Sequence, residues 1–322
     1  MNRPIRWYDY LTFNIYYLGL TALFQTTGIV VPLLVEHFIG PELKGTYFGI
    51  YRLWTLMAAL LAQALFGMLS DRSRSRWGRR RPFIAAGTLL TLGAMAGVAL
   101  TAGMRAGSLP GGQNFTGYWL MFSFAALVYF SSNLAQSAQQ GILPDLVPEG
   151  TRGRFSGVKA ILELPLALIV VNLAIRPIFT SPSLSFEQMI SAGMAATAGV
   201  IAVCMLVAML IPETRLADAP PRLDWRPFMR LLVMTGAFTL IILGAGWLTE
   251  QAQALVTAAQ SLGHLMLSMG LAGLLGMVLS VGLGVWLSVR ISVGSHAARR
   301  NPSGTWWVVN RLAFLVGATN LG

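Results

Sequence analysis

The sequence predicts an all-α protein that crosses a membrane several times, and three observations carry that prediction. The 322 residues are 55% hydrophobic, and only 11% are charged, whereas soluble domains average about 25% charged residues. Their mean hydropathy is +0.63. At about 20 apolar residues per span, the chain has room for about eight or nine membrane helices and for no large soluble domain. A soluble enzyme is therefore excluded.

Apolar runs separated by polar segments define each expected membrane helix. We expect spans at residues 11–35, 46–69, 83–104, 117–142, 158–178, 188–211, 231–250 and 264–289, with another beginning at Trp306. The predicted organisation is an N-terminal six-helix bundle at 1–212, a proline-rich cytoplasmic linker at 213–230, two additional helices at 231–290, a cytoplasmic loop at 291–305 and a truncated helix at 306–322. Because that last stretch is shorter than a membrane span, we expect the chain to be incomplete at its C-terminus.

The net charge of +11 reflects membrane topology and predicts no nucleic-acid partner. With the N-terminus inside, the arginine-rich segments 70–82, 212–230 and 290–300 all fall on the cytoplasmic side. This placement follows the positive-inside rule. The compact chain and its excess of arginine over lysine point to the cytoplasmic (inner) membrane of a prokaryote.

The residue pattern does not indicate a metal site, a cofactor site or a catalytic site. Cys204 is the single cysteine, and the three histidines are scattered, so no metal site is expected. We see no nucleophile with a base and an orienting group at usable spacing. We therefore expect neither a cofactor nor enzyme activity.

The most informative segment is the loop between the second and third spans. Asp71 is a lone acid among arginines, suited to a charged latch that forms and breaks, and a glycine before it permits close helix approach. An ordinary positive-inside loop is the alternative interpretation. The candidate gating residues are Gly67, Asp71, Arg72, Gly78, Arg79, Arg80 and Arg81.

The order of these residues resembles the cytoplasmic signature loop of the major facilitator superfamily: a glycine, three residues, Asp71-Arg72, and then Gly78-Arg79-Arg80. The longer run 70–83 resembles, more narrowly, the branch of sucrose transporters and glycoside-pentoside-hexuronide cation symporters. A second match, with that branch's fourth-to-fifth loop, involves Asn133, Gln136, Leu143, Asp145, Leu146, Pro148, Arg152, Gly153 and Arg154. The resemblance covers about residues 8 to 212, and 307–315 resembles the opening of the seventh span.

This resemblance implies the major facilitator fold, with an N-terminal six-helix bundle and a partial second half, and transport by alternating access. The signature loop would then help to hold the inner gate in one state. Two positions depart from the branch: Tyr129 stands where plant sucrose transporters have an aspartate, and Gln140 where they have an arginine. The helices at 231–250 and 264–289 are either a pair inserted between the halves or the seventh and eighth spans.

Two polar stripes at helical spacing are candidates for substrate binding. One consists of Asn14, Tyr17, Thr21 and Gln25 in the first span, and the other of Tyr129, Asn133, Gln136 and Gln140 in the fourth. Lipid tolerates such faces poorly, so both should point inward. Amides and aromatic rings suit an uncharged polar solute, but hydrogen bonding between helices explains the stripes equally well.

Glu163 is the one carboxylate well inside an expected span, with Lys159 one turn earlier. The pair is either a coupling site or a static ion pair, and the closeness of Lys159 favours the static pair.

The predicted function is secondary active transport of a small polar solute, such as a sugar or glycoside, with a coupled proton or sodium ion. The expected partners are that solute and the lipid bilayer. The alternatives are a non-transporting membrane factor that uses the same scaffold for assembly or for binding a pigment or lipid, and an inactive fragment.

Overall fold

The computed structural model describes residues 5–107, 112–211 and 213, and beyond them only single positions. Contacts divide the chain into two units, Met1–Leu223 and Asp224–Gly322, and the fold below is that of the first. In the described chain, six helical segments are long and apolar enough to cross a membrane: Trp7–Ile39, Lys44–Ser70, Arg81–Thr101, Phe115–Leu146, Glu149–Phe179 and Phe186–Ala208. These segments confirm the predicted all-helical architecture with six N-terminal spans. The spans expected at 231–250, at 264–289 and from Trp306 lie, apart from single positions, outside the described residues.

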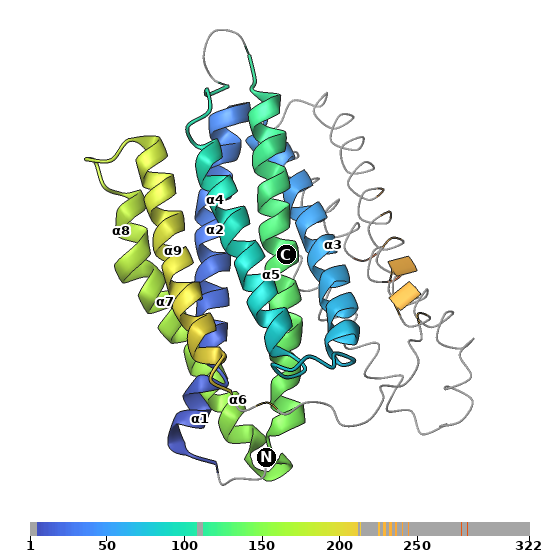
Figure 1. Ribbon diagram of the computed structural model, residues 1–322. Helices are drawn as coiled ribbons and strands as arrows, with labels where there is room; N and C mark the ends of the chain where they lie inside the picture. The colour runs from blue at the N-terminus through green and yellow to red at the C-terminus, as the bar shows by residue number, and fades with distance from the viewer. Residues whose placement is uncertain are drawn as a thin grey trace. The chain divides into compact units, whose positions relative to one another are not determined.

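The six segments form a bundle in which α4 and α5 lie side by side and α2 lies against several other helices (Figure 1). The elements are α1 (Trp7–Thr12), α2 (Ile15–Ile39), α3 (Lys44–Ser70), α4 (Arg81–Thr101), α5 (Phe115–Leu146), η1 (Glu149–Thr151), α6 (Arg152–Ile161), η2 (Leu162–Leu166), α7 (Ala167–Val170), η3 (Val171–Ile175), α8 (Arg176–Phe179) and α9 (Phe186–Ala208). α1 and α6 share one end of the bundle with the loop that joins α3 to α4. We call this the basic end, after the arginines of residues 71–80.

Local sequence signals set several of these helix ends. The Asn114 side chain accepts a hydrogen bond from the backbone N–H of Gly117 at the start of α5. Ser185 and Gln188 form a reciprocal capping box at the start of α9. Pro82 occupies the first turn of α4, where its missing N–H costs no intrahelical hydrogen bond.

Small residues allow the closest helix contacts. A Cβ atom built on Gly87 of α4 would lie 2.8 Å from both the backbone nitrogen of Ala135 and the carbonyl oxygen of Ser131 on α5. A Cβ on Gly19 of α2 would lie 3.0 Å from Cα of Ile201 on α9. Close packing of this kind drives helix association in lipid, where apolar burial contributes little.

Buried hydroxyl pairs join the same helices. Tyr16 of α2 meets Thr88 of α4, with 2.6 Å between their oxygens. The Thr26 and Thr197 hydroxyls, on α2 and α9, are 2.8 Å apart. Thr88 and Thr197 also donate to the carbonyl oxygens of Ile84 and Gly193 on their own helices, so each can accept a hydrogen bond from its partner on α2.

The fifth span is irregular because prolines interrupt its hydrogen bonding. Two π-helical turns, η2 and η3, separate its α-helical parts. Pro165 lies within η2 and has no N–H to donate, and Pro177 follows η3 by two residues. π-Helical turns are frequent at functional sites, and η2 contains Glu163.

Replacing Gly87 with alanine should weaken the bundle, because the new methyl group would collide with the α5 backbone. We expect Gly87→Ala to destabilise the protein by about 1–3 kcal/mol, the usual range for overpacking. Thermal unfolding of the purified protein measures the effect. Gly93→Ala is the matched control on the same helix, because a Cβ there meets nothing within 4 Å. Equal melting temperatures for the two variants would contradict the observed α4–α5 contact.

Candidate functional site

The loop at the basic end is shaped by its own sequence. α3 finishes at Ser70, whose hydroxyl donates to the Gly67 carbonyl oxygen at 3.0 Å. Gly78 has φ of +103°, a conformation that favours glycine, and a Cβ there would lie 2.5 Å from a carboxylate oxygen of Glu213. Any larger residue at this position would strain the backbone and displace the Glu213 side chain.

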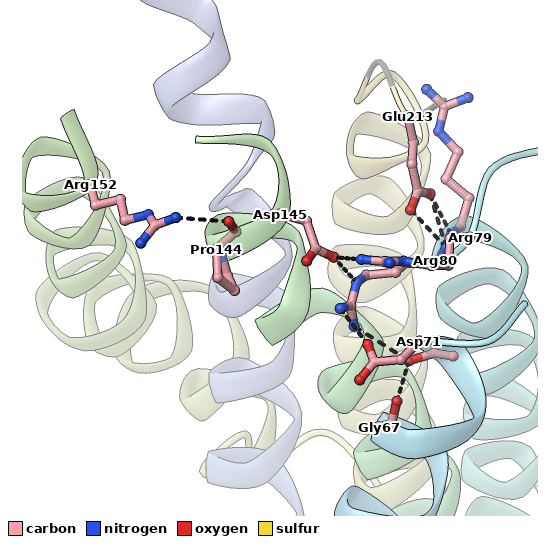
Figure 2. Close-up of polar contacts among 10 residues, drawn as sticks. Gly67, Asp71, Arg79, Arg80, Pro144, Asp145, Arg152 and Glu213 are labelled. Carbon is pink, nitrogen blue, oxygen red and sulfur yellow. Dashed lines mark hydrogen bonds and ion pairs between the residues drawn. The ribbon is translucent and has the colours of Figure 1, made fainter. Parts of the chain in front are cut away.

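Arg80 is the centre of this end of the molecule (Figure 2). Its side chain is only 6% exposed, and its Nη2 lies 2.5 Å from Oδ1 of Asp71. Its Nε lies 2.7 Å from Oδ2 of Asp145, which also pairs with Arg79. A mostly buried guanidinium is thus neutralised by carboxylates from two other segments, at the ends of α3 and α5.

Gly141 lets Arg80 lie directly against α5. A Cβ on Gly141 would come within 1.8 Å of Nη1 of Arg80. The expected close approach at Gly67 is not found among the described residues, because a Cβ there meets nothing within 4 Å. The small residue that permits close packing at this end is therefore on α5.

A fourth segment reaches the same point through Glu213, which follows α9. Its carboxylate accepts hydrogen bonds from the backbone N–H of Arg80, at 2.9 and 3.0 Å, and from that of Arg81, at 3.2 Å. These amide groups belong to the start of α4, where the helix dipole favours a negative charge. Figure 2 shows Glu213 and Asp71 approaching the Arg79–Arg80 segment from different sides.

Beside these ion pairs lies a cleft of about 630 Å³. It is lined by Gly67, Asp71, Arg79, Arg80, Ser137, Gln140, Gly141, Pro144 and Asp145. We call the set Asp71, Arg79, Arg80, Asp145 and Glu213 the arginine cluster.

The cluster includes two residues that the sequence analysis did not select as gating residues. Asp145 occurs in the fourth-to-fifth loop match, and Glu213 comes two residues after the sixth expected span. An isolated acid at the end of a helix, on the same side as an arginine-rich loop, is the signal that could have identified both. Of the predicted loop residues, Gly67, Asp71, Gly78, Arg79, Arg80 and Arg81 all lie in or next to the cluster.

The first polar stripe does not present one uniform face. Asn14 is buried and donates to the carbonyl oxygens of Tyr10 and Phe155, at 2.9 and 3.1 Å. Tyr17 is buried, Thr21 is half-buried and Gln25 is exposed. Asn14 therefore joins helices, while Gln25 remains accessible.

The second stripe is also divided. The buried Asn133 donates to the Tyr129 carbonyl oxygen at 2.7 Å, and the Tyr129 hydroxyl accepts from Nη1 of Arg52 at 3.4 Å. Gln136 is half-buried, and the exposed Gln140 lines the cleft. Neighbouring Gln139, absent from the stripe, is buried and donates to the Phe13 carbonyl oxygen at 2.7 Å.

Lys159 and Glu163 form the expected pair on the fifth span. Nζ of Lys159 lies 3.6 Å from Oε2 of Glu163, and both side chains are about one-third exposed. The same ammonium lies 4.1 Å from the centre of the Tyr17 ring, a cation–π contact that connects the pair to α2.

Comparison with known proteins finds partial similarity to a solute carrier. The chain is 32% identical over 126 residues to solute carrier family 45 member 4 of Mus musculus, a match that covers 38% of this chain and 15% of that protein. The crystal structure of a D-xylose-proton symporter matches 88% of this chain and 70% of its own, with a TM-score of 0.49 and 14% identity. No protein-family model matches the chain.

Removing the Asp145 carboxylate should destabilise the basic end, because Arg80 would lose one of its two acidic partners and keep only Asp71. We expect Asp145→Asn to lower stability by about 1–3 kcal/mol, the usual cost of leaving a buried polar group poorly paired. Thermal unfolding measures this change. Glu149→Gln is the control, because Glu149 is 89% exposed and its ion pair with Arg152 spans 3.6 Å; exposed pairs contribute little. Indistinguishable unfolding of the two variants would contradict the central place given to Arg80.

Proposed function

We propose that the protein is a secondary transporter of a small polar solute, built on the N-terminal half of a major facilitator fold and operating by alternating access. The observation that carries the proposal is the arginine cluster, in which one guanidinium and its backbone amide connect four segments at a single end of the bundle. The partial similarity to a solute carrier supports the same function. The resemblance of the loop to the superfamily signature is also consistent with it.

The cluster suits a latch because its partners differ in exposure. Asp71 is 55% exposed, whereas the Arg80 side chain is 6% exposed. Separating the segments would open the cluster to water, which would solvate the separated charges and offset much of the lost attraction. Such a contact can stabilise one state of the transporter without locking it permanently.

The polar positions of α2 and α5 are the proposed solute path. Tyr17, Thr21 and Gln25 on α2, with Tyr129, Gln136 and Gln140 on α5, present hydroxyls, amides and rings suited to a hydroxylated solute. We assign structural roles to Asn14 and Asn133, because both side chains donate to backbone carbonyl groups. On the positive-inside rule, the basic end faces the cytoplasm.

Transport can be tested with the chain reconstituted in liposomes. We expect saturable uptake of a labelled disaccharide under an imposed proton or sodium gradient. In Arg80→Gln the uptake rate should fall by more than about tenfold, because a shift of the gate equilibrium by roughly 1.4 kcal/mol has an effect of that size. Arg74→Gln is the matched control, because Arg74 is an exposed arginine of the same loop outside the cluster. Absence of uptake by the unmodified chain under any gradient would favour the non-transporting alternative.

Glu163 is the proposed coupling carboxylate, and Lys159 is its charge partner. A carboxylate that lies in an irregular helical turn of a span and is about one-third exposed can exchange a cation as the transporter changes state. The neutral Tyr129 leaves no acid at the fourth-span position that couples protons in the plant sucrose transporters.

We expect Glu163→Gln to retain solute exchange between the two sides of the membrane and to lose accumulation against a gradient. Counterflow and gradient-driven uptake, measured side by side, separate these activities. Glu36→Gln is the control, because it removes a different Lys–Glu pair, with Lys44 at 2.8 Å, outside the proposed path. Unchanged accumulation in Glu163→Gln would instead support a static ion pair.

A further inference from the structure

The ammonium of Lys159 has two described partners, and only one of them is acidic. Its Nζ lies 3.6 Å from Oε2 of Glu163 and 4.1 Å from the centre of the Tyr17 ring on α2. Charge-assisted hydrogen bonds between an ammonium and a carboxylate are about 2.7–2.9 Å long, and the Lys44–Glu36 pair has a distance of 2.8 Å. The ammonium of Lys159 is therefore shared between a carboxylate and a ring.

A side-chain hydrogen bond one turn closer to the basic end holds the ring beside the ammonium. Asn14 directly precedes α2, and its side chain donates to the Phe155 carbonyl oxygen of α6 at 3.1 Å. Tyr17 comes three residues after this asparagine, and Lys159 four residues after this phenylalanine. Residues at such spacings lie on the same face of a helix. The hydrogen bond and the cation–π contact therefore join the same two helix faces.

The Tyr17 ring gives the ammonium a sheltered position. Tyr17 is 5% exposed, whereas the side chains of Lys159 and Glu163 are about one-third exposed. The quadrupole of an aromatic ring attracts a cation on its face, and more strongly where water is excluded. Because the ammonium already covers it, this face of the ring is not available to the solute.

The helices packed against η2 bring no second acid to Lys159 within the part of the chain that the structure describes. α2, α6 and α7 make the main contacts with η2, and α7 has no ionisable side chain. The other ionisable residues of these helices bond elsewhere or lie towards a distant helix end: Tyr16, Glu36, His37, Arg152 and Arg154. When a coupled cation occupies Glu163, the Tyr17 ring is the described partner that remains for Lys159.

We infer that Tyr17 is a positioning residue for cation coupling: its ring holds the Lys159 ammonium while Glu163 carries the coupled cation. A charge without a partner is costly inside a span, so a lysine that lost its carboxylate would oppose occupation of Glu163. The ring lowers that cost, and the coupled cation therefore binds more tightly with the ring than without it. This inference rests on the proposed function and deepens it by giving a residue of α2 a part in the coupling step.

Thermal unfolding of the purified chain tests the contact without any need for transport. Tyr17→Leu removes the ring, and Tyr17→Phe keeps it. We expect the difference in melting temperature between these two variants to grow by about 1–4 °C when Glu163→Gln is also present, because the ammonium then depends on the ring. In the Lys159→Met background, Glu163→Gln should leave the difference unchanged, since no ammonium is there to be held.

This comparison cancels the packing difference between leucine and phenylalanine, which is common to all backgrounds. Tyr17→Met replaces Tyr17→Leu if the leucine variant does not fold. The inference is overturned if Glu163→Gln leaves the difference unchanged in the chain that retains Lys159, or if it changes the difference equally in Lys159→Met.

Gradient-driven uptake tests the consequence for coupling. We expect Tyr17→Leu to raise the cation concentration for half-maximal accumulation about two- to fivefold relative to Tyr17→Phe, as the loss of an ordinary cation–π contact implies. Both variants lack the hydroxyl, so its contribution cancels. Tyr8→Leu is the matched control and should not change this concentration. It removes another ring beside a cation, with Cζ of Arg6 5.9 Å from the ring centre, at the basic end.

The two measurements separate this inference from the transport proposal. The expected melting-temperature effect without any accumulation would support the ring as the position of the ammonium and contradict transport alone. Accumulation with the same cation dependence in Tyr17→Leu and Tyr17→Phe would contradict this inference alone.

Discussion

The buried guanidinium of Arg80 is the interaction on which the basic end of the bundle depends. It carries a full charge at 6% exposure, so it requires carboxylates at close range, and Asp71 and Asp145 provide them. The requirement constrains other residues in turn. Gly141 has to be small for the guanidinium to lie on α5, and Gly78 has to adopt a positive φ beside Glu213. The charges, the two glycines and the ends of four segments therefore form one interdependent arrangement.

Much of this fold could be predicted from the sequence, because each span carries its own apolar signal. The structure has helices at all six positions expected in the first 212 residues, and the sequence also shows Asp71 as a lone acid among arginines. The partners of Arg80 were not predictable in the same way, since Asp145 and Glu213 are 65 and 133 positions distant and no local pattern links them to the loop.

Helical spacing placed Asn14 and Gln25 in one stripe, but the neighbouring helices determine burial. Asn14 meets the Phe155 carbonyl oxygen of α6, whereas Gln25 remains exposed.

Two polar regions contact α2, one built around an arginine and the other around a carboxylate. Phe24 packs against Tyr129, which is hydrogen-bonded to Arg52, and Tyr17 contacts Lys159, which is paired with Glu163. The first region has a cation without an acidic partner among the described residues, and the second has a carboxylate whose neighbours include a lysine. α2 is the element common to both. A small rotation of this helix would alter the surroundings of both charges together, and in the proposed transporter this rotation would connect the solute to the coupled cation.

Glu213 recognises the start of α4 through main-chain amides. These hydrogen bonds do not involve the side chains of residues 80 and 81, so substitutions at Arg81 would leave them in place. The constraint falls on the acid and on Gly78, whose missing side chain makes room for it. In divergent homologues, Arg81 should therefore vary more freely than this glycine and glutamate, and the pair should be gained or lost together.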